Sequence, residues 1–144
     1  MKVINEIVKF HGEMTAWRRD IHQYPELKFE EFRTSELVAK KLNEFGLEVH
    51  SGLAKTGVVA KISNGKGPSI GLRADMDALP LQEKNLFAHK SCNLGKMHAC
   101  GHDGHTAMLL GAAKYLSVSR NFKGTVNFIF PFISIVFFSY FFIN

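Results

Sequence analysis

The sequence of 144 residues is poor in cysteine, proline and tryptophan. It contains two cysteines, four prolines and one tryptophan. Two cysteines cannot build the disulfide framework of a small secreted protein, so the sequence is typical of a reduced, cytoplasmic protein. The first ten residues carry charges and no apolar run, which argues against a secretory signal. The net charge of +5 is scattered and too small to indicate nucleic-acid binding.

Charge is missing altogether from one stretch, Val126 to Asn144, which also holds seven of the 13 Phe. Its part from Val126 to Ile143 is at the low end of the ~17–25 residues that span a bilayer, so a membrane anchor is one interpretation. A buried pair of strands is another. The abrupt change of composition and Pro131 favour a third interpretation, an aberrant tail produced by a shifted reading frame.

The hydrophobic periodicity before this stretch predicts helices alternating with strands. Apolar residues at three- and four-residue steps predict helices over Ile4–Tyr24, Thr34–Phe45 and Thr106–Leu116. Strands are predicted at 47–50, 57–62, 69–73 and 123–130, and the strand at 69–73 is expected to be buried. This alternation is typical of an α/β layered domain.

Two acidic residues follow the apolar run Ser69–Arg73. Asp75 and Asp77 are two positions apart, so in an extended backbone their side chains project to the same side. Ligands of open α/β sheets gather outside the carboxyl ends of the strands, which makes this pair a candidate site. The residues fit equally well a loop in which the aspartates cap a helix or a turn, and the segment by itself leaves both interpretations open.

A denser cluster lies between His98 and His105. These eight residues hold three His, one Cys and one Asp, all of which are potential metal ligands. Cys100 and His102 have small neighbours and can turn toward one ion. A thiolate and an imidazole suit Zn²⁺, whereas nearby carboxylates suit a harder ion such as Mn²⁺. The cluster therefore predicts a divalent metal site.

The two clusters resemble the dinuclear metal-dependent amidohydrolases, the family of hippurate hydrolases, N-acyl-amino-acid amidohydrolases and plant auxin-conjugate hydrolases. The resemblance is carried by Arg73–Pro80 and Met97–His105, and it extends to Arg19–Leu27, Glu30-Glu31 and Gly57. It implies an α/β fold, the incomplete N-terminal part of a mixed-sheet metallohydrolase catalytic domain. Residues 1–130 would form this partial domain, and residues 131–144 would be an aberrant hydrophobic tail.

The resemblance also implies roles for individual residues. Cys100 corresponds to the bridging ligand of two ions, Mn or Zn, and His102 to a terminal ligand of one of them. Asp77 falls at the position of the catalytic carboxylate that orients a metal-binding group, and Asp75 where distant members have a metal-binding His. Three residues are expected to surround the ligands without binding metal: Asp75, His98 and His105.

Members of this family hydrolyse the amide bond of a small N-acyl amino acid, with a Glu as general base. In the family, the strand that matches Gly124–Phe130 leads into Gln-Pro-Ala-Glu-Glu, which holds the base and a metal ligand. No carboxylate follows this strand here. The resemblance therefore implies an N-acyl amino acid as the ancestral substrate, and we expect weak metal binding and no activity from this chain.

A non-enzymatic alternative uses the same region differently. Cys92, His98, Cys100 and His102 would form a small metal-binding module, or the tail would anchor such a module in a membrane. The eight-residue separation of Cys92 from Cys100 is unusual for a zinc knuckle and disfavours this alternative.

Overall fold

The last strand among the described residues lies inside the sheet. The computed structural model of the protein describes residues 4–131. Its sheet has the order β1-β2-β4-β3, with β1 at Glu48–Leu53, β2 at Gly57–Asn64, β3 at Ser69–Arg73 and β4 at Gly124–Phe130. Strand β4 is antiparallel to β2 and parallel to β3, and β1 is antiparallel to β2. The sheet is therefore mixed, as the family resemblance implies.

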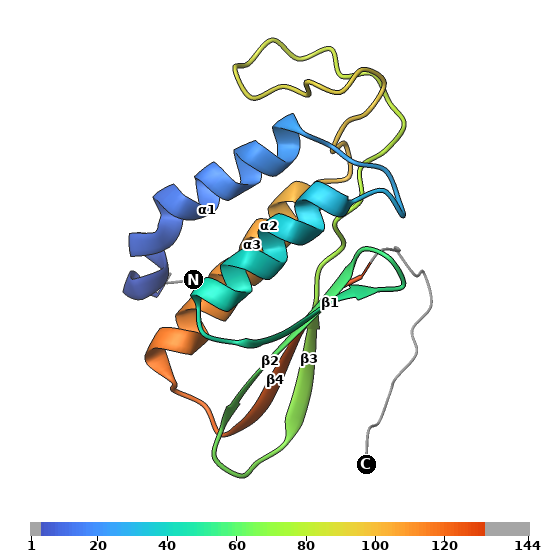
Figure 1. The fold of residues 1–144 in the computed structure, drawn as a ribbon. Helices are drawn as coiled ribbons and strands as arrows, with labels where there is room; N and C mark the ends of the chain where they lie inside the picture. The colour runs from blue at the N-terminus through green and yellow to red at the C-terminus, as the bar shows by residue number, and fades with distance from the viewer. Residues whose placement is uncertain (1–3, 132–144) are drawn as a thin grey trace.

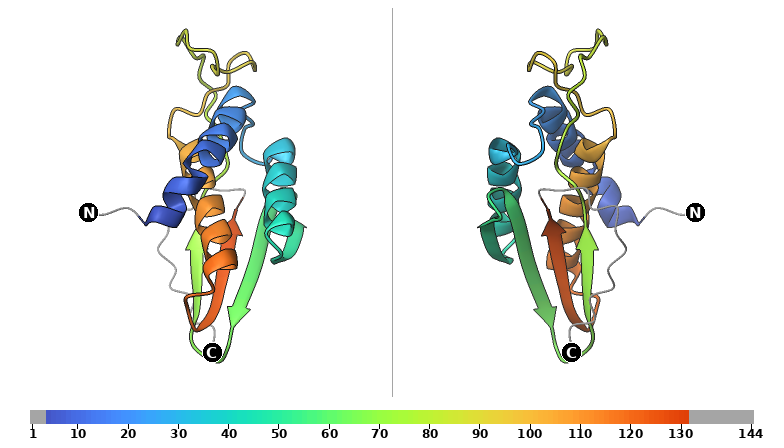
Figure 2. Two further views of the ribbon diagram at one scale, coloured as in Figure 1. Left: turned by 90° about the vertical axis from the view of Figure 1, so that its left-hand side faces the viewer. Right: turned by 90° about the vertical axis from the view of Figure 1, so that its right-hand side faces the viewer.

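The three helices within residues 4–131 lie on one face of this sheet (Figures 1 and 2). They are α1 at Asn5–Gln23, α2 at Phe32–Glu44 and α3 at His102–Ser119. Helix α3 packs against β4 and α2 against β1 and β2, while α1 packs on α3. This two-layer arrangement confirms the predicted α/β class, and the predicted helices over residues 4–24 and 34–45 are confirmed within two residues at each end.

The core sits between the helices and the sheet. Along β4, Val126, Phe128 and Phe130 are buried, and the residues between them are partly exposed, which is the period of a strand with one face in the core. Burying each Phe side chain contributes roughly 1.5–3 kcal/mol. The opposite face carries polar pairs, including Ser63 Oγ and Thr125 Oγ1 at 2.9 Å. The alternation in β4 thus fixes which face of the sheet the helices cover.

The prediction that residues 69–73 form a buried strand is wrong in its burial. Strand β3 has the predicted bounds, but four of its five residues are exposed. It is an edge strand that pairs only with β4 among the described strands, and Ile70 is 51% exposed. The apolar run correctly predicted a strand, but it could not show that one edge of that strand has no neighbour in the part of the chain that the structure describes.

Helix α3 begins four residues before the predicted start at Thr106. Gly101 precedes it with φ at +81°, a left-handed conformation that glycine adopts without a steric penalty. The first turn contains polar residues and glycine, and the apolar periodicity begins only at Thr106. Because the prediction relied on that periodicity, it missed the turn that places His102 and His105 on the helix rather than in a loop.

A long irregular segment, residues 74–101, joins β3 to α3 and extends past the C-terminal end of α1 (Figure 1). It is closed at its base by paired backbone contacts between Leu79 and Met97. The Cys92 N–H donates to the Gln23 carbonyl at 2.8 Å, which ties the segment to the end of α1. The carboxyl ends of β3 and β4, the start of α3 and the end of α1 therefore meet at one end of the molecule.

Only the first part of the C-terminal stretch lies within the described residues. Val126–Phe130 belongs to β4, so the first residues of the supposed membrane span form part of the sheet. Residues 132–144 lie outside the described residues. Among residues 4–131, no helix has the length and apolarity needed to cross a membrane.

A close backbone approach at the start of β4 gives a stability prediction. Gly124 has φ at +107°, and a Cβ there would lie 2.1 Å from the Pro68 carbonyl oxygen. We expect Gly124→Ala to destabilise the fold by roughly 2–5 kcal/mol, from left-handed strain and overpacking together. Gly65→Ala is the control, because Gly65 has φ at +71° but nothing within 4 Å of the added Cβ. It should cost roughly 1–2 kcal/mol in urea unfolding, and equal costs for the two variants would contradict the prediction.

Candidate metal site

The candidate ligands lie where the segment 97–105 turns into α3. The Gly104 and His105 N–H groups donate to the Gly101 carbonyl at 2.9 and 3.1 Å, which forms the first turn of the helix. Thr106 Oγ1 donates to the Asp75 carbonyl at 3.0 Å and attaches this turn to the segment that follows β3. The two sequence clusters are therefore adjacent in space, as their chemistry predicts.

The His102 ring is held by Asp77. Its Nδ1 lies 2.9 Å from Asp77 Oδ1 and 2.9 Å from the Asp77 carbonyl oxygen. Both side chains are nearly buried, with 12% and 11% of their surface exposed. A carbonyl oxygen only accepts hydrogen bonds, so Nδ1 carries the proton. In the neutral ring, Nε2 is then the nitrogen with a free electron pair, which is the form in which histidine binds a metal.

The other candidate ligand, Cys100, is an exposed free thiol two residues before His102. Cys92 is also a free, exposed thiol. Among residues 4–131, no group of three or more His, Cys, Asp or Glu side chains is placed so that it could hold a metal ion. The non-enzymatic module of Cys92, His98, Cys100 and His102 is therefore not formed, because the four side chains do not converge.

Asp75 contacts a different residue from Asp77. Its carboxylate forms an ion pair with Arg73, at the end of β3. Strand β3 ends at that Arg, so both aspartates lie beyond the strand whose alternation suggested that they share a side. The contact with His102 is made by Asp77.

The two other histidines of the cluster have opposite surroundings. His98 is 4% exposed, and neither of its ring nitrogens has a hydrogen-bond partner among the described residues. Burial lowers the pKa of His98 to about 4, so its ring is neutral at pH 7. His105 is exposed on α3, with its ring centroid 5.5 Å from that of His102. His98 is thus part of the interior, and His105 borders the candidate ligand from outside.

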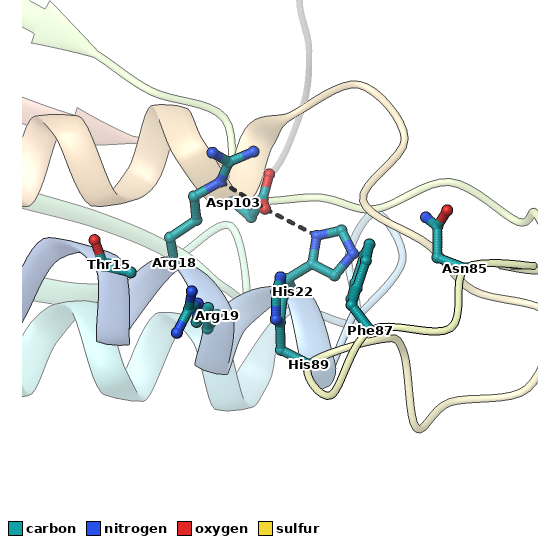
Figure 3. Close-up of a pocket in the computed structure, with 8 residues that line it drawn as sticks. All are labelled: Thr15, Arg18, Arg19, His22, Asn85, Phe87, His89 and Asp103. Carbon is teal, nitrogen blue, oxygen red and sulfur yellow. Dashed lines mark hydrogen bonds and ion pairs between the residues drawn. The ribbon is translucent and has the colours of Figure 1, made fainter.

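Sequence reasoning missed a network of polar side chains beside this site. His22, near the end of α1, lies between Asp103 and Glu83, and Arg18 Nε lies 3.2 Å from Asp103 Oδ2. Arg18, His22 and Asp103, drawn in Figure 3, border a hollow of about 410 Å³ with Arg19, Asn85, Phe87 and His89 in its lining. His22 belongs to a segment that carries the family resemblance, but its sequence position gave no sign of its partners, 61 and 81 residues away.

A second missed residue, Glu31, is fully buried and close enough to Asp77 for their charges to interact. Thr56 Oγ1 donates to Glu31 Oε2 at 2.7 Å, and Oε1 has no hydrogen-bond partner among the described residues. Burial raises the pKa of Glu31 above its ordinary value, and the negative charge of Asp77 acts in the same direction. The site thus has a carboxyl group beside it that resists ionisation.

Comparison with known proteins agrees with the sequence resemblance. Residues 71–131 match the family described as "Peptidase family M20/M25/M40". The chain is 53% identical over 131 residues to a hippurate hydrolase of Campylobacter jejuni, with 90% of this chain and 34% of the relative covered. It is 49% identical over 120 residues to an N-acyl-L-amino acid amidohydrolase of Geobacillus stearothermophilus, with 82% and 32% covered.

A solved structure shows the same fold. The Bacillus subtilis YXEP protein, described as a dinuclear metal binding peptidase from the M20 family, superposes with a TM-score of 0.81 at 44% sequence identity. The match covers 85% of this chain and 35% of that protein. The chain therefore spans about a third of the length of the relatives that it matches.

The buried Glu31 gives a prediction with a defined sign. The pKa of Glu31 is raised in the folded protein, so the fold is favoured while this carboxyl is protonated. Its contribution to the free energy of unfolding is fully present below the ordinary pKa of 4.5 and is lost as pH rises through the raised pKa. Glu31→Gln keeps an acceptor for Thr56 and cannot ionise. We expect this variant to gain stability relative to the parent between pH 4.5 and pH 8, measured by urea unfolding across that range.

Two further variants serve as controls for this test. Thr56→Val removes the donor and should cost roughly 1–3 kcal/mol. Glu48→Gln should show the opposite sign, because hydrogen bonds from Lys61 and His50 lower the pKa of Glu48, and its contribution is lost as pH falls. Parallel pH profiles for the parent and Glu31→Gln would show that Glu31 is ionised without penalty.

Proposed function

Through residues 71–131 the chain belongs to Peptidase family M20/M25/M40, and we propose that it carries the first ligands of a two-metal amidohydrolase site. The observation that carries this proposal is the contact of His102 Nδ1 with Asp77, which leaves Nε2 available to a metal two residues after the Cys100 thiol. Carboxylate–histidine pairs of this kind orient the metal-binding ring in metalloenzymes.

The donor atoms fit a divalent metal in kind but not in number. A thiolate and an imidazole suit Zn²⁺, and the carboxylates nearby suit Mn²⁺. Catalytic zinc usually takes three protein ligands, whereas Cys100 and His102 supply two. We therefore propose that Cys100 and His102 hold metal weakly, that Asp77 orients His102, and that Asp75, His98 and His105 surround them without binding it. The free thiol that this site needs is kept in a reducing cytoplasm.

The proposed substrate class follows from the relatives. Two of them are named as a hippurate hydrolase and an N-acyl-L-amino acid amidohydrolase. We propose that the site descends from one that cleaves the amide bond of a small N-acyl amino acid. A bound pair of divalent ions supplies the polarisation of the amide carbonyl and an activated water. The contribution of the described residues is to present one thiol and one oriented imidazole to those ions.

The same proposal explains why we expect no hydrolysis from these 144 residues alone. The reaction needs a group that takes a proton from water and returns it to the leaving nitrogen. No Asp or Glu follows Asp103 in the sequence. Of the carboxylates nearby, Asp77 is engaged by His102, and Asp103 by His22 and Arg18. Asp75 forms an ion pair with Arg73. We infer that, among residues 4–131, no carboxylate beside the candidate ligands is left to act as the general base.

Metal binding is tested with Co²⁺, whose bond to a thiolate produces a charge-transfer absorption in the near ultraviolet. We expect the chain to show this absorption and Cys100→Ser to lose it. Cys92→Ser is the matched control, because Cys92 is also a free, exposed thiol and should not contribute. Loss of the signal in Cys92→Ser would instead favour the non-enzymatic module, and no signal in the parent would refute the metal site.

Catalysis is tested by incubating the purified chain with hippurate and either Mn²⁺ or Zn²⁺. We expect no release of glycine above the metal-only blank, measured by an amine-specific assay after long incubation. A full-length relative is the positive control for the assay. Glycine release that disappears in Cys100→Ser would overturn the claim that this chain is inactive.

A further inference from the structure

One imidazole joins three parts of the chain at the edge of the candidate site. His22, at the end of α1, has its Nδ1 2.9 Å from Asp103 Oδ2 (Figure 3). Its Nε2 lies 3.1 Å from Glu83 Oε1. All three side chains are buried, with His22 9%, Glu83 7% and Asp103 1% exposed. The ring therefore connects the first turn of α3 to the loop of residues 80–96.

Both nitrogens of the His22 ring face a carboxylate oxygen at hydrogen-bond distance. Burial opposes ionisation of Glu83, but the Ser91 backbone N–H and the Asn85 side chain, followed by His22, lower its pKa. A carboxylate only accepts hydrogen bonds, so the ring is the hydrogen-bond donor between these two side chains.

The partners on either side are themselves fixed. Glu83 Oε1 accepts from Asn85 Nδ2 at 2.8 Å, and Oε2 accepts from the Ser91 backbone N–H. Asp103 has one further side-chain partner, Arg18, whose side chain is 60% exposed. Charge at the exposed surface is screened by water, so the buried contact with His22 constrains Asp103 more than Arg18 does.

Asp103 directly follows the candidate ligand His102 in the sequence. The position of its carboxylate sets the position of the first turn of α3, and His102 projects from the same turn toward Asp77. A shift of that turn would move His102 Nε2 relative to the Cys100 thiol. Two fixed points therefore define the candidate ligand: Asp77 holds the ring, and Asp103 holds the backbone beneath it.

We propose that His22 is a positioning residue for the metal ligands, which it fixes by linking Asp103 at the start of α3 to Glu83 in the loop of residues 80–96. This inference rests on the proposed metal site and deepens it. His22 does not contact the metal; it acts through Asp103. Replacing the ring removes the group that separates and bridges two buried carboxylates, which displaces the turn that carries His102.

The test compares Co²⁺ affinity in His22→Gln with that in Lys114→Met, both in the full chain. Lys114 also joins α3 to α1, through Glu13, but it lies away from the ligands. We expect His22→Gln to weaken Co²⁺ binding by about 10–100-fold, the usual effect of losing a group that orients a ligand, and Lys114→Met to change it by less than about twofold. Thermal unfolding of each variant, followed by circular dichroism, gives the loss of stability in parallel.

The outcomes separate positioning from general destabilisation. If affinity falls equally in both variants for an equal loss of stability, the role of His22 is only structural and the proposal fails. Glu83→Gln is the milder variant if His22→Gln does not fold. It keeps the side-chain shape, removes one negative charge, and should weaken Co²⁺ binding to an intermediate extent, whereas unchanged affinity would overturn the proposal.

Amide hydrogen exchange gives a readout that needs no metal. We expect His22→Gln to lose protection in residues 80–105 while β2 and β4 keep theirs. If the parent shows no Co²⁺ signal, the proposed metal site fails, and exchange alone then decides the role of His22. A uniform loss of protection across the fold would overturn positioning by His22, and a loss confined to residues 80–105 would uphold it.

Discussion

The burial of β4 beneath α3 is the constraint on which the rest of the structure depends. Phe128 and Phe130 are fully buried, and their strand lies between β2 and β3 although it comes last in the described sequence. Strand β3 pairs in parallel with β4, so the carboxyl ends of both strands lie at the same edge of the sheet. Helix α3 enters at that edge, which is why Asp77 can reach a residue 25 positions further along the chain.

The burial of acidic side chains at this edge determines which hydrogen-bond donors must lie beside them. Asp77, Glu83 and Asp103 are acidic residues that the fold removes from water, and each has a nitrogen donor within hydrogen-bond distance. Such burial is tolerated only with partners, because an unpaired buried carboxylate is very costly. Two histidines supply these contacts: His102 for Asp77, and His22 for both Glu83 and Asp103. The packing of the core therefore sets the orientation of the ring that we propose as a metal ligand.

The sequence predicted the fold better than it predicted the contacts within the site. Period and capping depend on neighbouring residues, so the helices, the strands and the α/β class could be predicted, whereas the mixed sheet was implied by the family resemblance. The edge position of β3 depends on which strands lie beside it, and the run Ser69–Arg73 contains no such information. The polar first turn of α3 lacks apolar periodicity, so its start was placed four residues too late.

The same limit applies to the site residues. Cys100, His102 and Asp77 could be proposed because they lie in two short clusters whose residue types have a chemical meaning. The structure brings Asp77 and His102 into contact, but it pairs Asp75 with Arg73 instead. His22 and Glu31 could not be assigned roles, because their partners Asp103 and Thr56 are 81 and 25 residues away. A residue whose role is to hold another is visible only once the chain has folded.

The contacts that orient His102 involve no metal, so the ring is ordered before a metal binds. In a zinc finger the ligands are ordered by the metal, so binding and folding are one event. Here Asp77 fixes the ring, and packing of α3 on β4 fixes its backbone. The cost of ordering His102 is therefore met when the core forms. Affinity is then limited by the number of donors, so each ligand added beside Cys100 and His102 would strengthen binding without requiring the fold to rearrange.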